Sequence, residues 1–231
     1  MKRVFILSMC LFTTFVAFSQ KPSAESIRKR FNLGTTVFTD FWQKVPDSVN
    51  TRTINQGADV FVTYSFPMDK NDHMFFFAGA GLGAHNLYSK SQLKLDSDNS
   101  SYFDDFPSTA NGHAVTVRKS KLSITYFDIP FGFQYKAANK FHATLGFKVG
   151  WSINDHTKYK GTDYTSTSTG RTVRLKESSL PNIQNIHYGP FLTVGYKWVG
   201  LTASYQITSV FEKDLGPQIY PISVGVTFKP F

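Results

Sequence analysis

The sequence contains a single cysteine, Cys10, which lies inside an apolar segment near the start of the chain. Disulfide bonds therefore cannot stabilise the rest of the chain, although small exported domains often depend on them. Acidic residues are also few, with 16 Asp and Glu against 25 Lys and Arg, so the formal net charge is +9. The basic residues form no stripe interleaved with aromatics, and we predict no nucleic-acid partner. Attraction to anionic lipid or lipopolysaccharide fits the charge.

Only one long apolar run is present, at residues 4–18, directly after two basic residues. The small residues Ala17 and Ser19 then form a cleavage-site pattern, which predicts a signal peptide at 1–19 and a mature domain at 20–231. A transmembrane anchor is the alternative, but the run is shorter than the roughly 20 residues that a spanning helix needs. A lipoprotein signal is a further alternative, which the bulky residue before the cysteine disfavours. We therefore expect an exported protein.

Aromatic residues are abundant at 16%, with 23 Phe and 11 Tyr, and this favours β structure. The segment 140–154, "KFHATLGFKVGWSIN", carries apolar residues at almost every odd position and polar or small residues at every even position. Such alternation predicts a β-strand with one apolar and one polar face. Soluble strands usually have about 5–6 residues, whereas a tilted membrane strand needs roughly 9–11. The length of this segment favours a strand that crosses a membrane.

Eight segments of this kind are separated by links that alternate between long and short. The links 89–120 and 155–183 are very long and polar, whereas 137–139 and 198–199 are tight. The pattern predicts an all-β, eight-stranded, antiparallel up-and-down transmembrane β-barrel, with long extracellular loops and short periplasmic turns. A soluble β-sandwich or a periplasmic lipocalin-like binding barrel is the alternative. The predicted strands are 30–41, 57–66, 74–88, 121–136, 140–154, 185–197, 200–211 and 220–231.

An eight-stranded barrel has an interior just wide enough to be filled by side chains, so we predict a plugged lumen. If the fourth and fifth strands pair around Ala138, Asp128 lies opposite Lys148 and Gln134 opposite His142, all on the interior face. These four residues are the predicted interior polar pairs. A buried ion pair and a polar pair suit a lumen that contains little water.

Three residue patterns indicate irregularities in the predicted strands. Pro130 and Pro190 fall inside strands, where each removes a ladder N–H group. Because a closed barrel has no edge strand, we expect β-bulges at these prolines. In the fourth strand the alternation changes phase above Phe127, and we expect Ile124 and Leu122 to change face there.

The segment "YFDIPFGFQYKAANKFHATLGFKVGWSIN" at 126–154 resembles the central hairpin of the PorT-like outer-membrane β-barrel family. The segment 200–231 resembles the last hairpin of that family, which ends in a phenylalanine. The resemblance implies an outer-membrane barrel of a Gram-negative envelope, and the founding member is tied to the type IX secretion machinery. It also implies that Phe231 is the aromatic residue presented to the barrel assembly machinery. The residues that match the central motif are Phe127, Asp128, Ile129, Pro130, Tyr135 and Lys136.

No chemical motif stands out in the sequence, so we predict no enzyme activity and no catalytic, cofactor-binding or metal-binding residues. His85 and His187 are expected to point inward near the loop end, but without the spacing of a metal site. The sequence favours a structural or interaction component of the envelope, with lipid, lipopolysaccharide and envelope proteins as partners. A narrow transport channel for small solutes is the alternative.

Overall fold

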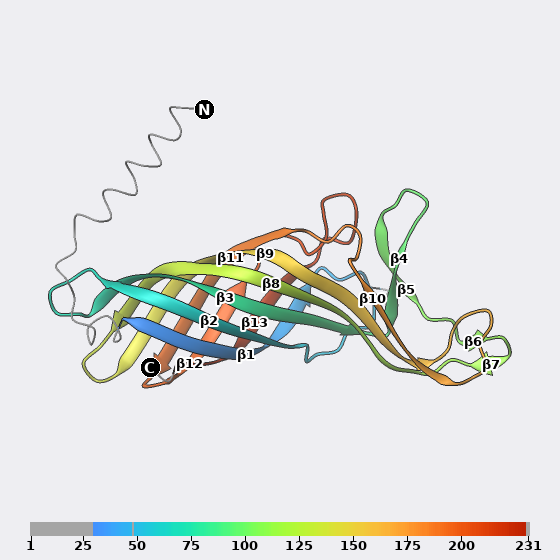
Figure 1. Cartoon of the computed structure of the whole chain (residues 1–231), viewed down its shortest axis with the longest axis horizontal. Helices are drawn as coiled ribbons and strands as arrows, with labels where there is room; N and C mark the ends of the chain where they lie inside the picture. Colours follow the sequence, from blue (N-terminus) through green and yellow to red (C-terminus); the bar gives the residue numbers. More distant parts are fainter. Residues whose placement is uncertain (1–29, 48, 230–231) are drawn as a thin grey trace, which may run out of the picture.

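The computed structural model describes residues 30–47 and 49–229, so the predicted signal peptide and Phe231 lie outside the described part. In this part, no helix has the length and apolarity of a membrane span. Eight strands run antiparallel to their neighbours and close into a ring in the order β1-β2-β3-β8-β9-β11-β12-β13 (Figure 1). The predicted eight-stranded up-and-down barrel is confirmed. Its strands are β1 (Phe31–Gln43), β2 (Gln56–Pro67), β3 (Met74–Ser89), β8 (Val117–Lys136), β9 (Phe141–Thr162), β11 (Ile186–Tyr196), β12 (Val199–Tyr205) and β13 (Tyr220–Phe228).

The outer wall of the barrel is apolar and uncovered. Leu145 on β9 is 62% exposed and Leu201 on β12 is 69% exposed, whereas the neighbouring Thr144 is only 2% exposed. Period-two alternation places these apolar side chains outward and the polar ones inward. A continuous apolar wall of this kind is stable where lipid surrounds it. The alternation in 140–154 is therefore explained by lipid on one side and a filled lumen on the other.

The turn between β8 and β9 is centred on Asn139, one residue later than predicted. The N–H of Ala137 donates to the carbonyl of Phe141 at 2.8 Å, and Lys140 adopts a left-handed φ of 71° that closes the chain. Moving the centre by one residue moves every opposed pair by two. The predicted register of this hairpin is therefore wrong by two residues, although the same side chains remain on the interior face.

The loop end is longer and more ordered than the predicted coil links. β8 and β9 run beyond the other barrel strands, and the additional strand β10 (Thr172–Ser178) pairs with the far half of β9 (Figure 1). We call these far parts of β8, β9 and β10 the extension. The link 89–120 also contains two small hairpins, formed by β4 (Ser91–Leu95) with β5 (Ser101–Asp105) and by β6 (Thr109–Ala110) with β7 (His113–Ala114).

A β-bulge separates the extension from the membrane part of β9. Thr125 pairs with Asn154 and Tyr126 with Ser152, so Ile153 is left without an opposed residue. Beyond this bulge the outward positions of β9 change from odd to even numbers. The prediction that Ile124 and Leu122 change face in β8 is wrong, because both stay on the interior face with Tyr126. The interior itself becomes apolar at this level.

The prolines do not produce the expected bulges. Pro130 pairs with Lys148, and Pro190 with Phe147, without a register shift. Each proline instead lies beside a gap in its second ladder: β3 has no partner for Pro130, and the β11–β12 pairing starts only after Pro190. The missing N–H group is accommodated by these gaps.

The seventh strand ends at Tyr205, so its predicted extension to residue 211 is wrong. The following residues fold over the mouth of the barrel, where the N–H of Val210 donates to the carbonyl of Ile219 at 3.0 Å. Phe211 forms an isolated bridge with Ile183. Val210 and Phe211 fill the mouth rather than face lipid, whereas Ile207 remains exposed.

Candidate functional site: the closed barrel interior

Charged side chains from four strands meet in the middle of the lumen. Asp59 of β2 and Asp128 of β8 flank Lys148 of β9, with Lys148 Nζ at 3.6 Å from Asp59 Oδ2 and 3.7 Å from Asp128 Oδ2. Asp40 of β1 is fully buried. All four occupy interior positions of the alternating pattern. Because successive side chains of a strand point to opposite faces, the position of each charged residue in the alternating pattern directs it into the lumen.

Two histidines complete this charged group. His85 Nδ1 lies 3.0 Å from Asp40 Oδ2, while the hydroxyl of Ser223 donates to Asp40 Oδ1 at 2.6 Å. His187 Nε2 lies 2.6 Å from Asp128 Oδ1. The two imidazole rings are 6.4 Å apart, so they approach each other across the lumen. We call Asp40, Asp59, His85, Asp128, Lys148 and His187 the lumen network.

The lumen network leaves no room for a side chain at Gly150. A Cβ atom at Gly150 would collide with Asp128 Oδ1 and with His187 Nε2, so only glycine allows the carboxylate and the imidazole to meet there. Buried charges are tolerated when they are paired and hydrogen-bonded. Lys148 is paired with a carboxylate on each side, and Asp128 is in turn hydrogen-bonded to His187.

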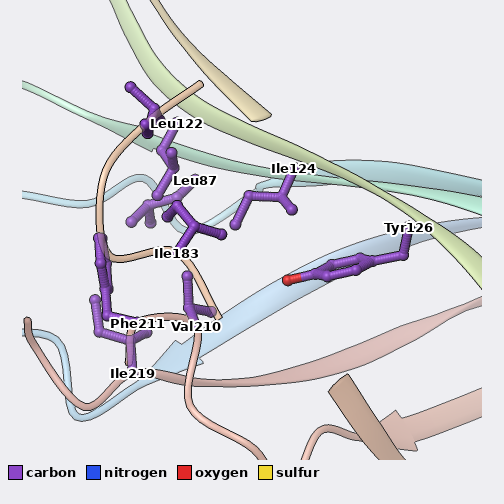
Figure 2. Packing of buried hydrophobic residues seen from close by; sticks show 9 residues of the cluster. Leu87, Leu122, Ile124, Tyr126, Ile183, Val210, Phe211 and Ile219 are labelled. Carbon is purple, nitrogen blue, oxygen red and sulfur yellow. The ribbon is translucent and has the colours of Figure 1, made fainter. Parts of the chain in front are cut away.

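A hydrophobic cluster closes the lumen on the loop side of the network. Its side chains come from β3, β8 and the loops around 183 and 211, and Figure 2 shows them directed toward one another across the mouth. Tyr126 joins the cluster to the network, because its ring lies 3.9 Å from the ring of His187. The buried members are Leu87, Leu122, Ile124, Tyr126, Leu180, Ile183, Val210, Phe211 and Ile219.

A small cavity of about 70 Å³ lies on the turn side of the network. Asp59, Asp128 and Lys148 line one part of it, and the rings of Phe61 and Phe191 another. A volume of this size holds one or a few water molecules rather than a solute. The interior thus changes from polar at the network to apolar at the cluster along the barrel axis.

The predicted interior residues all lie on the inner face, with changed partners. Asp128 is paired in the ladder with Gly150 rather than Lys148, and its contact with Lys148 is diagonal. Gln134 lies opposite Thr144, not His142, and its Nε2 is 3.4 Å from Thr144 Oγ1.

His142 lies opposite Lys136 beside the periplasmic turn. It is separated from the lumen network and belongs to the turn end of the barrel.

Sequence reasoning missed Asp40 and Asp59, which supply two of the three carboxylates. Both occur in phase with the polar positions of their strands, so the signal was the same alternation that identified Asp128. His85 and His187 point inward as expected. His85 is bound to Asp40, which the sequence reasoning missed, and His187 to Asp128, which it had paired with Lys148.

In the described residues, no group of three or more His, Cys, Asp or Glu side chains has the arrangement of a metal site. Both lumen histidines bind carboxylates, and in the same part of the chain neither is hydrogen-bonded to a hydroxyl group. Acyl-transfer sites pair a histidine with a nucleophilic hydroxyl or thiol. In the lumen network, the carboxylates instead lie beside Lys148 and the two histidines, which places opposite charges and hydrogen-bonding partners next to one another.

A family model described as an outer membrane protein beta-barrel domain matches residues 18–228. The chain belongs to this family. It is an outer-membrane β-barrel protein, in agreement with its closed sheet and apolar wall. No curated protein sequence matches the chain.

Two solved outer-membrane barrels are similar at low identity. Ail, the attachment invasion locus protein of Yersinia pestis, was solved in complex with the heparin analogue sucrose octasulfate. It is 11% identical, with 86% of this chain and 97% of that chain covered and a TM-score of 0.37. A mutant porin of Rh. blastica is 10% identical, with 86% and 99% covered and a TM-score of 0.22.

Proposed function

We propose that this protein is a non-conducting interaction component of the outer membrane. The barrel acts as an anchor, and the loop end presents the surfaces that contact partners. The observation that carries the proposal is the double closure of the lumen, by the paired charges of the network and by the hydrophobic cluster above it. A solute path would have to separate both layers, and eight-stranded barrels have little interior space to spare.

The test is conductance in planar bilayers with refolded, full-length mature protein. The sample is first shown to be folded by its different gel migration before and after boiling, and a trimeric porin serves as the positive control. We expect no discrete conductance steps above the bare membrane. Reproducible steps from folded protein would contradict the proposal and favour the alternative of a narrow channel.

The extension supports the partner-binding part of the proposal. It carries the pairing of β8, β9 and β10 beyond the barrel, and it contains far more regular structure than a link that only connects two strands needs. Links between elements are usually short, with a median of about 4–6 residues. An ordered sheet outside the membrane is instead a preformed contact surface.

The resemblance to PorT-like barrels supports a more specific proposal, in which the partner is a protein of the secretion machinery. The test is deletion of the gene in the organism that encodes it, followed by comparison of the proteins released into the medium. A reduced set of secreted proteins, restored by the wild-type gene, is the expected result. An unchanged set contradicts the secretion link but leaves the anchor proposal intact.

The same resemblance supports Phe231 as the residue read by the barrel assembly machinery. Phe231→Ala is then expected to lower the amount of folded barrel in the outer membrane while leaving refolding of purified protein in detergent unchanged. Loss of refolding in detergent would show instead that the residue stabilises the barrel itself.

A further inference from the structure

Six basic side chains form two rows across the outward face of the extension. The ladder places Lys121 of β8 opposite Lys158 of β9 and Lys158 opposite Lys176 of β10. A second row follows two residues further along each strand. We call these two rows, Lys121–Lys158–Lys176 and Lys119–Lys160–Arg174, the basic face.

The basic face is electrostatically unfavourable for the chain alone. Directly opposed residues in an antiparallel pair have Cβ atoms about 4.5–5.5 Å apart, and like charges at such positions destabilise the sheet. Among the described residues, none of the six basic side chains forms an ion pair with a carboxylate. The nearby acidic residues Asp155 and Glu177 pair with Ile124 and Thr157, in the phase of the opposite face. The two signs of charge are thus segregated by face.

An aromatic ring extends the basic face onto β3. Tyr88 lies opposite Lys121, and the Nζ atoms of Lys119 and Lys121 are 5.3 and 5.7 Å from its ring centroid. The guanidinium of Arg52 is 5.4 Å from the same ring. Cation–π contacts of this kind hold basic groups in place without neutralising them. The cations are therefore gathered and oriented but still lack counter-charges.

The position of the basic face indicates which anion it meets. It lies on the same outward side of β8 and β9 as the lipid-facing residues Phe127 and Trp151, so it looks sideways over the surrounding membrane. Lys158 follows Ile153, the last exposed apolar residue of β9, by five positions, which is roughly 17 Å along a strand.

At a strand tilt of about 40°, this length corresponds to a height of roughly 13 Å above the apolar wall. The headgroup layer of an ordinary bilayer is only about 5–8 Å thick on each side. The basic face therefore stands above simple phospholipid headgroups, at a level that the sugars of a glycolipid reach.

We propose that the basic face binds the phosphate-bearing saccharide headgroups of outer-leaflet glycolipids of the lipopolysaccharide type. A row of phosphates beside the barrel supplies the counter-charges that the chain omits, and several lysines can share one phosphorylated headgroup. The site is lateral and lies outside the barrel wall. It goes beyond the proposed anchor role and holds whether or not the lumen conducts.

The experiment compares binding of two probes to full-length mature protein folded in detergent micelles. The probes are lipopolysaccharide and the same lipopolysaccharide after enzymatic removal of its phosphates. We expect the wild-type protein to prefer the phosphorylated probe, with an affinity that falls as salt is raised. In the variant K158Q/K160Q/K176Q, affinity for the phosphorylated probe should fall about 100-fold, from roughly 1 kcal/mol for each basic residue at an anionic surface.

The matched control is K70Q/K94Q/K213Q, which removes the same number of charges from exposed lysines outside the basic face. Its affinity should change less than about threefold, the remainder being the long-range effect of net charge. Gel migration before and after boiling confirms that both variants are folded. K158Q/K160Q/K176Q removes repulsion between the opposed basic residues of each row, so it should fold at least as well as the wild type.

Two results would overturn the proposal. One is equal affinity of K158Q/K160Q/K176Q and the wild type for phosphorylated lipopolysaccharide. The other comes from a third probe, a soluble sulfated polysaccharide: if the wild type binds this polymer and shows no preference between the two glycolipid probes, the face serves a soluble polyanion. Binding of the phosphorylated glycolipid that is lost only in K158Q/K160Q/K176Q supports the proposal.

Discussion

The lumen network and the basic face treat charge in opposite ways. In the lumen, Lys148 lies between Asp59 and Asp128, and each histidine contacts a carboxylate. On the basic face, lysines lie opposite lysines in two successive rows. The acidic residues nearest to these lysines, Asp155 on β9 and Glu177 on β10, lie on the other face of the sheet.

This difference follows from what surrounds each region. Inside the barrel neither water nor mobile ions are available in quantity, so a charge must be compensated by the chain itself. Beyond the membrane wall, the environment supplies counter-charges. Uncompensated charge in an ordered sheet therefore indicates a surface that is completed by another molecule, whereas compensated charge indicates a region that is complete as it stands.

The largest effect is expected from removing the central cation of the lumen. Lys148→Met leaves Asp59 and Asp128 buried without their partner and should lower the free energy of unfolding by about 4 kcal/mol. Equilibrium unfolding in guanidinium chloride from lipid vesicles measures this loss. A matched change, Lys94→Met, removes the exposed ion pair with Asp104 and should leave the midpoint unchanged. Equal losses in the two variants would contradict the contrast between buried and exposed charge.

The next effect is expected from the cluster that closes the mouth. Phe211 is 1% exposed, so Phe211→Ala leaves a cavity and should lower the free energy of unfolding by about 3 kcal/mol. Phe133→Ala makes the same change on the lipid-facing wall, where the side chain is 49% exposed, and should cost distinctly less. The same vesicle unfolding assay compares them. A larger loss at the lipid-facing position would show that the cluster is only loosely packed.

A smaller effect of opposite sign is expected on the basic face. Lys158→Glu replaces two like-charge pairs, with Lys121 and Lys176, by two opposite-charge pairs, and each should stabilise the sheet by roughly 0.2–1 kcal/mol. Slower hydrogen exchange of the β9 and β10 amides, measured by mass spectrometry without added lipopolysaccharide, reports this gain. Faster exchange in the variant would show that the opposed lysines within this row do not repel one another.

The smallest effect is expected at the periplasmic turn between β2 and β3. The backbone N–H groups of Met74 and His73 donate to Asp69 at 2.7 and 2.9 Å and hold the pKa of this carboxyl below its usual 3.8. A lowered pKa stabilises the fold above pH 3.8 and loses this contribution as the pH falls through the folded-state value. Asp69→Ala should therefore be slightly less stable than the wild type at pH 6, and the difference should shrink below pH 3.8. A difference that persists in acid would assign the effect to packing.

Much of the barrel was predictable because lipid imposes a strict pattern. Wherever a strand lies between lipid and lumen, alternate residues differ sharply in polarity, as Leu145 and Thr144 do. The inward direction of Asp128, Lys148 and the two lumen histidines follows from phase alone. The residues opposite Asp128 and Lys148 could not be predicted in this way, because a turn centred on Asn139 instead of Ala138 changes every opposed pair.

The loop end was poorly predictable because no lipid contrast exists there. In β9 beyond Ile153, lysines alternate with Tyr159 and Gly161, a pattern that a solvated loop also shows. Phe211 falls in the odd apolar phase of β12, but it is used together with Val210 in the mouth cluster. Both errors arise where the surroundings of the chain change from lipid to water or to protein.

The bulge at Ile153 decides which side chains of the outer half of β9 face inward. One additional residue leaves the strand continuous and still alternating, yet it exchanges the identities of inside and outside for every position that follows. With the extra residue, Tyr159 faces inward, and Lys158 and Lys160 face outward. Without it, the same sequence would direct Lys158 and Lys160 into the barrel mouth and Tyr159 outward. Deletion of Ile153 would thus reverse the inward and outward faces of the whole outer segment of β9, including residues that Ile153 does not contact.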